Sequence, residues 1–217
     1  MNRKLLLNTY IFKGLTESEL DGALSYLDAR EKRYKKGENL IIQGDKITSF
    51  AIIISGTVQV SCDDIDGNRM IMATVSKGEM FAESLAVTAN GDSPIYAVAT
   101  EDSAVLWLSA APIRKNIVSA PLHSKIISNF MSAIAFKCLS MNDRVQILSK
   151  KTIREKVIAY ISLLPSHDKS GEIILPLSRQ DMASYLGVER SALSRELSNM
   201  QKEGIISYKG NTFKFLR

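Results

Sequence analysis

Apolar side chains recur along residues 31–108 in short runs that alternate with turn residues. The runs are strand-length and rich in β-branched residues, and the gaps between them carry the Gly, Asn or Asp residues that tight turns need. Strands this short and this numerous favour an antiparallel barrel or jelly roll over a fold of alternating strands and helices. The predicted strands are residues 39–42, 50–54, 57–61, 70–75, 95–100 and 104–108.

Helical spacing appears on both sides of this region. Residues 16–29 begin with a capping-box pattern, Thr-Glu-Ser-Glu, and continue with apolar residues at helical intervals. Residues 121–147 contain no glycine and, after Pro121, no proline, and their apolar residues recur every three or four positions. A stripe this long exceeds what a small barrel covers, so it predicts pairing with the same helix of a second chain; the alternative is a helix packed wholly on its own barrel. Three residues of the stripe are expected to be packed rather than to bind a ligand: Met131, Cys138 and Met141.

The last third of the chain predicts three helices and a hairpin. A helix over residues 152–164 stops at Pro165, and a short strand over 173–175 follows the loop 165–171. Ser178 can cap a second helix, which ends at Gly187, and the third helix covers residues 188–203. Two short helices joined through a glycine turn form a helix-turn-helix, and the hairpin over residues 205–213 predicts a wing.

The third helix carries the candidate chemistry. In a helix-turn-helix, the first half of the second helix of the motif enters the DNA major groove. Arginine can pair bidentately with guanine, and serine can bond to a base or a phosphate. The candidates are Glu189, Arg190, Ser191, Ser194 and Arg195, with Lys209 of the wing on a phosphate. The structural alternative is an ordinary helical hairpin with surface arginines.

Charge supports a nucleic-acid partner. The 217 residues are 45% hydrophobic and 24% charged, which excludes a disordered chain. Residues 1–142 hold 15 basic and 15 acidic side chains, whereas residues 143–217 hold 13 and 8. The whole net charge of +5 therefore belongs to the last third, as expected of a DNA-binding module beside a neutral one.

Other composition features narrow the setting. No apolar run approaches the roughly 18 residues of a membrane span, and the N-terminus lacks the pattern of a signal peptide. Two cysteines and two histidines exclude a Cys/His zinc site and predict a protein of the reducing cytoplasm. No Walker loop, GxSxG, HExxH or GxGxxG motif is present, so no enzyme is expected. The functional alternative is a ligand-binding or interaction module whose C-terminal helices do not bind DNA.

Taken in order, the motifs resemble those of Crp/Fnr transcription regulators, the family of the cyclic-AMP receptor and the fumarate–nitrate regulator. The resemblance covers nearly the full chain, and its strength lies in the order and spacing of pieces that are weak singly. The pieces are Lys36-Gly37-Glu38, Gly44-Asp45, Ser55-Gly56-Thr57-Val58, Lys77-Gly78-Glu79, Ala82-Glu83-Ser84-Leu85, Thr152-Ile153-Arg154-Glu155-Lys156, Leu177-Ser178-Arg179-Gln180-Asp181-Met182-Ala183, Arg190-Ser191-Ala192-Leu193-Ser194-Arg195-Glu196-Leu197 and Glu203-Gly204-Ile205-Ile206.

The resemblance implies an α+β architecture in three parts. These are an N-terminal antiparallel double-stranded β-helix, or jelly-roll, sensor domain over residues 1–120, a dimerisation helix over 121–148, and a winged helix-turn-helix over 149–217. It further implies a homodimer on an inverted-repeat DNA site, with RNA polymerase as a partner at loop 165–171. By position, Arg190, Ser191, Ser194 and Arg195 would read bases or hold nearby phosphates, and Ser178 and Arg179 would hold phosphate. Many members carry a base-reading glutamate where this chain has Ser191, which implies a different half-site.

The sensor region departs from the family members that bind cyclic AMP. Those members are similar to one another in a motif of Gly-Glu-Leu, followed about ten residues after the glutamate by Arg-Ser or Arg-Thr. The arginine of this motif neutralises the cyclic phosphate. Here Ala82, Glu83 and Ser84 stand at the first position, and Ser93 and Pro94 at the second. These five residues are the candidate effector pocket. Without the arginine a buried phosphate would lack its charge partner, so the expected effector is an unidentified small molecule other than cyclic AMP.

Cofactor chemistry is limited by the residue types. An iron–sulfur cluster like that of the oxygen-sensing branch needs about four cysteines, which two cannot supply. Haem is the alternative that the residue types leave open, with His123, His167, Cys138 or a methionine as ligand. The simpler interpretation is that both histidines are ordinary and that no cofactor or metal is bound.

Overall fold

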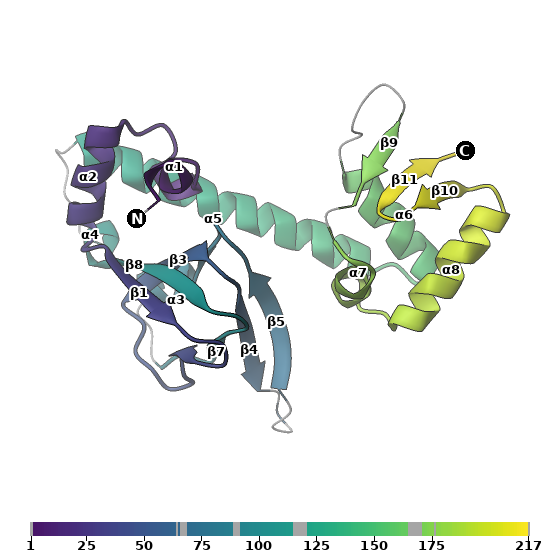
Figure 1. Cartoon of the computed structure of the whole chain (residues 1–217), viewed down its shortest axis with the longest axis horizontal. Helices are drawn as coiled ribbons and strands as arrows, with labels where there is room; N and C mark the ends of the chain where they lie inside the picture. Colours follow the sequence, from purple (N-terminus) through teal and green to yellow (C-terminus); the bar gives the residue numbers. More distant parts are fainter. Residues whose placement is uncertain are drawn as a thin grey trace. The chain divides into compact units, whose positions relative to one another are not determined.

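The computed structural model describes residues 2–63, 65, 69–88, 92–114, 121–164, 171–175 and 177–216, with Arg69 described by its backbone alone. The chain forms two compact units, Met1–Ile134 and Ala135–Arg217, and their boundary falls within the long helix α5 (Pro121–Leu148) (Figure 1). Within the described residues no helix combines the length and the apolar composition that crossing a membrane takes.

Two antiparallel four-stranded sheets build the first unit, which confirms the predicted jelly roll. One sheet has the order β1 (Arg30–Tyr34), β8 (Ser103–Ser109), β3 (Ser49–Ser55), β6 (Met80–Phe81). The other has the order β2 (Asn39–Ile41), β7 (Tyr96–Ala99), β4 (Val58–Asp63), β5 (Arg69–Val75). Alternate side chains of these strands point between the sheets and form an apolar core, because successive residues of a strand face opposite sides.

Helices bury the other face of the sheet that contains β3 and β8. They are α1 (Arg3–Leu7), the 3₁₀ helix η1 (Tyr10–Phe12), α2 (Glu17–Tyr26), α3 (Glu83–Thr88), α4 (Ala111–Arg114) and the first half of α5. The predicted capping box is present: Thr16 accepts from the Glu19 N–H while the Glu19 carboxylate accepts from the Thr16 N–H. Phe130 of α5 meets Phe50 of β3 edge to face at 5.5 Å, so α5 is part of this core.

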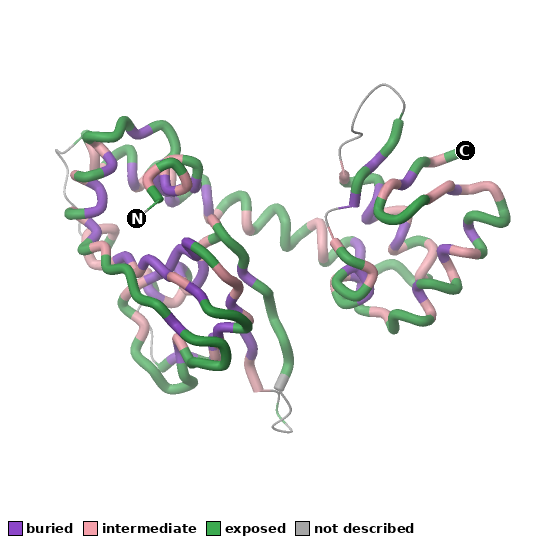
Figure 2. Tube along the Cα trace, in the orientation of Figure 1, coloured by how far each residue is buried: buried purple, intermediate pink, exposed green. Residues whose placement is uncertain are grey.

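Helix α5 leaves the apolar surface of its middle part uncovered in the single chain. Ile126, Phe130 and Ala133 are buried against the first unit, whereas Met131 and Met141 are 66% and 67% exposed. Cys138 is exposed as well, so the expectation that these three residues are packed is wrong for one chain alone. Figure 2 shows this exposed stretch in the middle of the helix.

The second unit follows the predicted order of helices and strands. It contains α6 (Ile153–Leu163), β9 (Glu172–Ile174), α7 (Arg179–Leu186), α8 (Arg190–Lys202), β10 (Ile206–Lys209) and β11 (Thr212–Phe215). The strands form an antiparallel sheet in the order β10-β11-β9. One apolar core joins the helices to this sheet and also includes Ile147 near the end of α5. The predicted winged helix-turn-helix is thus confirmed.

Several predicted features lie outside the described residues. They are His167 and the loop 165–171 apart from Gly171. The predicted contact of this loop with RNA polymerase therefore stays a prediction.

Candidate nucleic-acid interface

The turn between α7 and α8 depends on Gly187. Its φ of 61° lies in the left-handed region, where glycine carries no steric penalty. A Cβ at this position would also lie 3.1 Å from Cδ2 of Leu148, so a larger residue would meet α5. The Val188 N–H then bonds the Ala183 carbonyl at 3.0 Å and closes the turn. Helix α8 begins immediately afterwards, with Glu189 as its N-cap.

One side of α8 is buried and the other presents the predicted reading residues. Leu193, Leu197 and Met200 pack into the core. The other side is exposed at four predicted positions: Arg190, Ser191, Ser194 and Arg195. Because residues three and four apart are neighbours on a helix surface, the pairs 190/194, 191/194 and 191/195 join these four side chains into a single surface, which we call the reading face. Ser198 and Gln201 extend this face by another turn, which the family motif does not indicate.

The reading face is basic partly because Arg154 binds Glu196 of α8 and Glu203, which caps the end of that helix. Its guanidinium donates to Glu196 Oε1 at 2.6 Å and to both carboxylate oxygens of Glu203, at 2.7 and 2.8 Å. The hydrogen bonds from Arg154 lower the pKa of the Glu203 carboxyl. Two negative charges of α8 are therefore neutralised away from the reading face, which favours an anionic partner there.

Glu189 caps the beginning of α8 with its side chain. Its Oε2 accepts from the Ala192 N–H at 2.9 Å and from the Ser191 hydroxyl. These bonds, the one from Ser191 first among them, and the nearby charge of Arg195 lower the pKa of the Glu189 carboxyl. To contact DNA, the Ser191 hydroxyl would have to give up its hydrogen bond to Glu189. Base recognition by Glu189 or Ser191 therefore stays a prediction.

Ser178 and Arg179 are also held by contacts within the unit. The Ser178 hydroxyl caps α7 by accepting from the Asp181 N–H at 3.2 Å and donates to Asp181 Oδ2 at 2.6 Å. Arg179 donates to the Gly210 carbonyl at 2.6 Å. Its guanidinium lies 5.2 Å from the ring centroid of Tyr208, and burial lowers its pKa. Arg179 thus ties α7 to the wing, and its predicted phosphate contact stays a prediction, as does that of the exposed Lys209.

The candidate effector residues come from two segments of the first unit. Glu83 is 5% exposed in the first turn of α3, whereas Ser84 beside it is exposed. Ser93 is 3% exposed, and backbone hydrogen bonds to Gly44 and Asp45 hold it in place. Pro94 is exposed. A serine this enclosed offers no charge to a phosphate, which is consistent with the sequence prediction.

The space between the two sheets is filled by side chains. Phe81 meets Trp107 edge to face at 5.9 Å, and the Trp107 indole N–H donates to the Tyr34 hydroxyl at 2.9 Å. Buried Val, Ile and Ala residues surround them. A charged phosphate and a polar sugar would be costly to bury among these apolar side chains.

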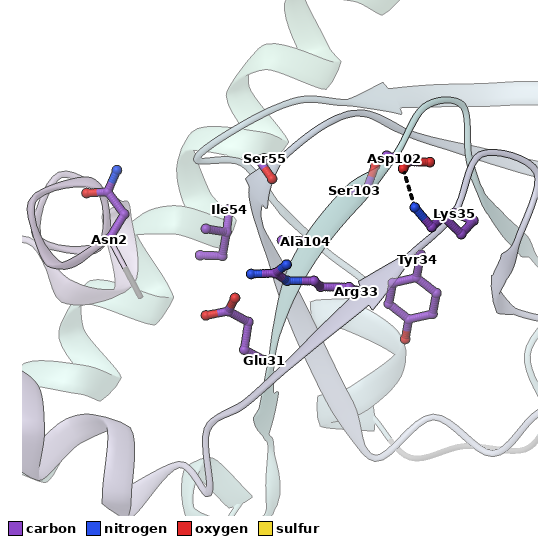
Figure 3. A pocket seen from close by; sticks show the side chains of 10 residues that line it. All are labelled: Asn2, Glu31, Arg33, Tyr34, Lys35, Ile54, Ser55, Asp102, Ser103 and Ala104. Atoms are coloured by element: carbon purple, nitrogen blue, oxygen red, sulfur yellow. Dashed lines mark hydrogen bonds and ion pairs between the residues drawn. The ribbon is translucent and has the colours of Figure 1, made fainter.

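A pocket of about 490 Å³ opens elsewhere on the first unit (Figure 3). It is lined by Asn2, Glu31, Arg33, Tyr34, Lys35, Ile54, Ser55, Asp102, Ser103 and Ala104. Lys35 pairs with Asp102 at 2.7 Å. None of the five candidate effector residues lines this pocket, so the sequence prediction and the pocket mark separate places on the unit.

Ala82 offers a direct test of the backbone in the candidate effector segment. Its φ of 62° is left-handed, which costs an L-residue roughly 1 kcal/mol or more and costs glycine nothing. We expect Ala82→Gly to raise the free energy of unfolding by about 1 kcal/mol, measured by chemical or thermal unfolding. In the matched control Ala86→Gly, in the helical part of α3, stability should fall by about as much. A lower stability of Ala82→Gly would contradict the strained backbone.

Each of the two units contains a match to a known domain family. Residues 31–118 match the cyclic nucleotide-binding domain, and residues 155–216 match the Crp-like helix-turn-helix domain. Over 208 residues the chain is 29% identical to the fumarate and nitrate reduction regulatory protein of Vibrio cholerae, and the match covers 93% of this chain and 80% of that protein.

Solved structures show the same fold. FixK2 from Bradyrhizobium japonicum is 21% identical, with a TM-score of 0.57 over 87% of this chain and 93% of that one. The c-di-GMP responsive regulator CLP of Xanthomonas campestris is 16% identical, with a TM-score of 0.63 over 93% of this chain and 100% of that one.

In the described residues no group of three or more His, Cys, Asp or Glu side chains is placed to hold a metal ion.

Proposed function

Because the chain belongs to the Crp/Fnr family of DNA-binding transcription regulators, we propose that it acts as a homodimer whose two α8 helices read an inverted-repeat DNA site. This family regulates transcription and is not one of enzymes. The alternative of a C-terminal domain that does not bind DNA loses its support, since residues 155–216 match the Crp-like helix-turn-helix domain. We further propose that an effector other than cyclic AMP binds the first unit and thereby controls the protein.

The reading face carries the proposal. Arg190 and Arg195 lie five residues apart on the exposed side of α8, with the exposed Ser194 between them. A B-DNA major groove admits a helix, and two arginines at this spacing suit guanines or the phosphates beside them. The two acidic side chains that would repel DNA from the middle and end of α8 are instead paired with Arg154.

The experiment that tests this function is selection of duplex DNA from a random pool by the purified protein, without added ligand, near physiological salt. We expect enrichment of an inverted repeat with half-sites about one helical turn apart. Enrichment of a single asymmetric half-site would contradict the proposed dimer. If the protein retains no DNA even at low salt, the proposal that it binds DNA is wrong.

The uncovered stripe of α5 supports dimerisation. Met131, Met141 and Val145 are more than 60% exposed in the single chain, and Cys138 lies among them on the same side of the helix. Exposed apolar residues at intervals of three and four match the seam of a parallel helix pair. In such a pair, residues at the centre of the seam face their own copies.

Cys138 is a built-in reporter of this arrangement. We expect mild oxidation with copper phenanthroline to give a species of twice the 24.0 kDa chain mass on a non-reducing gel, because paired seam positions bring two Cα atoms within disulfide range. Cys138→Ser should abolish the cross-link and Cys62→Ser should keep it. Equal cross-linking of Cys138→Ser and the unchanged protein would contradict the parallel seam.

A further inference from the structure

The last turns of α5 are built into the DNA-binding unit. Ile147 is 1% exposed within the core that contains α6, α7 and α8. Leu148 lies against Gly187, where a Cβ would approach it to 3.1 Å. The end of the proposed dimer helix and the helix-turn-helix are therefore in direct contact.

Arg144 adds a third contact between the same two elements. The centre of its guanidinium lies 5.2 Å from the ring centroid of Tyr185 in α7, a cation–π distance. On α6, Tyr160 packs on Tyr185 with ring centroids 5.2 Å apart. Arg144, Tyr185 and Tyr160 thus form a cluster that joins α5, α7 and α6, which we call the latch.

The burial of the latch marks it as more than a surface contact. Arg144 Nε is buried and has no hydrogen-bond partner among the described residues, and the same is true of the Tyr160 hydroxyl. Tyr160 is 5% exposed, and burial, with the nearby Tyr185, raises its pKa to about 12. An apolar side chain on α5 would avoid the cost of an unpaired N–H, so the position of Arg144 indicates that its contact with the Tyr185 ring matters.

We propose that Arg144 is a positioning residue for DNA recognition, which fixes the angle between α5 and the reading helix through Tyr185. The inference rests on the proposed dimer. In a dimer joined along α5, the latch sets the separation and orientation of the two α8 helices. These must match half-sites about one helical turn apart, roughly 34 Å. Arg144 itself touches no DNA in this account.

Loosening the latch should therefore affect the second half-site and spare the first. Once one α8 is bound, the other binds as an intramolecular partner, and its effective concentration depends on how well its position is fixed. We expect Arg144→Met to weaken binding to the inverted repeat by roughly 10- to 100-fold. Binding to the same DNA with one half-site scrambled should change less than about twofold, and the slope of log affinity against log salt should stay the same.

The measurement is fluorescence anisotropy of the full-length protein on both DNAs, at several salt concentrations, with thermal unfolding of each variant alongside. Tyr185→Phe, which keeps the ring, serves as the matched control and should bind like the unchanged protein. Should Arg144→Met fail to fold, Arg144→Gln, which keeps a polar side chain but removes the cation, allows the same comparison with the same expected loss.

Three results would overturn the proposal, and a fourth separates it from the proposed function. An unchanged ratio of full-site to half-site affinity would show that the latch positions nothing. An equal loss on both DNAs with a shallower salt slope would make Arg144 a phosphate contact, and an equal loss with a lower melting temperature would make it purely structural. If the unchanged protein shows no advantage on the inverted repeat, the dimer itself fails, and the latch with it.

Discussion

Replacing Arg190 and Arg195 together by alanine should remove most of the sequence preference of the protein while leaving it folded. Both side chains are exposed on the reading face, so their loss opens no cavity. A good bidentate arginine–base pair discriminates against a wrong base by roughly 1–3 kcal/mol, so the loss of two such pairs predicts a fall of about 30-fold to 10⁴-fold in specific affinity for each half-site. Competition titration of the selected site against scrambled DNA measures this loss directly.

The control for this variant must lose the same charge elsewhere. Arg30→Ala combined with Lys32→Ala removes two positive charges from the exposed strand β1 of the first unit, where Arg30 pairs with the exposed Asp28 at 2.8 Å. Its preference for the selected site should be unchanged. If the Arg190/Arg195 variant retains its full preference, α8 is not the reading helix; if both variants lose affinity equally on all DNA, the arginines act only through net charge.

The helix that carries these arginines is bonded to α6 through Arg154. Arg154 reaches from the first turn of α6 to Glu196, the residue that follows Arg195, and to Glu203, which caps the end of α8 about two turns further on. Its guanidinium forms three charge-assisted bonds, which fix both carboxylates and the helix that carries them. The same bonds raise the pKa of the Arg154 guanidinium above its ordinary value, Glu203 contributing most. Arg154 thus joins α6 to α8 and neutralises two carboxylates near the reading face.

The local signals of the second unit were sufficient to predict its elements from the sequence. Ser178 and Gly187 mark the beginning and the end of α7, as a cap and a left-handed residue that act through their own backbone. Thr152 caps α6 in the same way. Signals of this kind depend on neighbours within a few residues, and a sequence displays them directly.

Features set by distant contacts could not be predicted in this way. Strand β1 carries Arg30, Glu31, Lys32 and Arg33, all exposed, so it lacks the apolar alternation that indicates a strand and is recognised only through its pairing with β8. The Arg154 bonds span 42 and 49 residues. Arg179 matches a phosphate-binding position by sequence, yet its contact with Gly210, 31 residues away, is visible only once the wing is folded.

The wing and α7 are held together at Phe213, and its loss should be the most damaging single change in the second unit. The side chain is 1% exposed and stacks on Tyr208 with centroids 5.1 Å apart and planes inclined by 14°. Its other neighbour is the Arg179 guanidinium, 4.6 Å from the ring centroid. Phe213→Ala would leave a cavity and would remove the nearer of the two rings that the Arg179 guanidinium contacts, which together should cost about 3–5 kcal/mol.

The expected result is a selective loss, because Phe213 belongs to the core of one unit alone. Scanning calorimetry of the full chain should show the transition of the second unit lowered by roughly 15–30 °C and that of the first unit unmoved. DNA binding should disappear at the temperature where the second unit melts. Lys214→Ala, the exposed neighbour on β11, is the matched control and should leave both transitions in place. A single transition that moves as a whole would mean that the two units unfold together, and the wing would then be coupled to the sensor unit rather than stabilised by its own core.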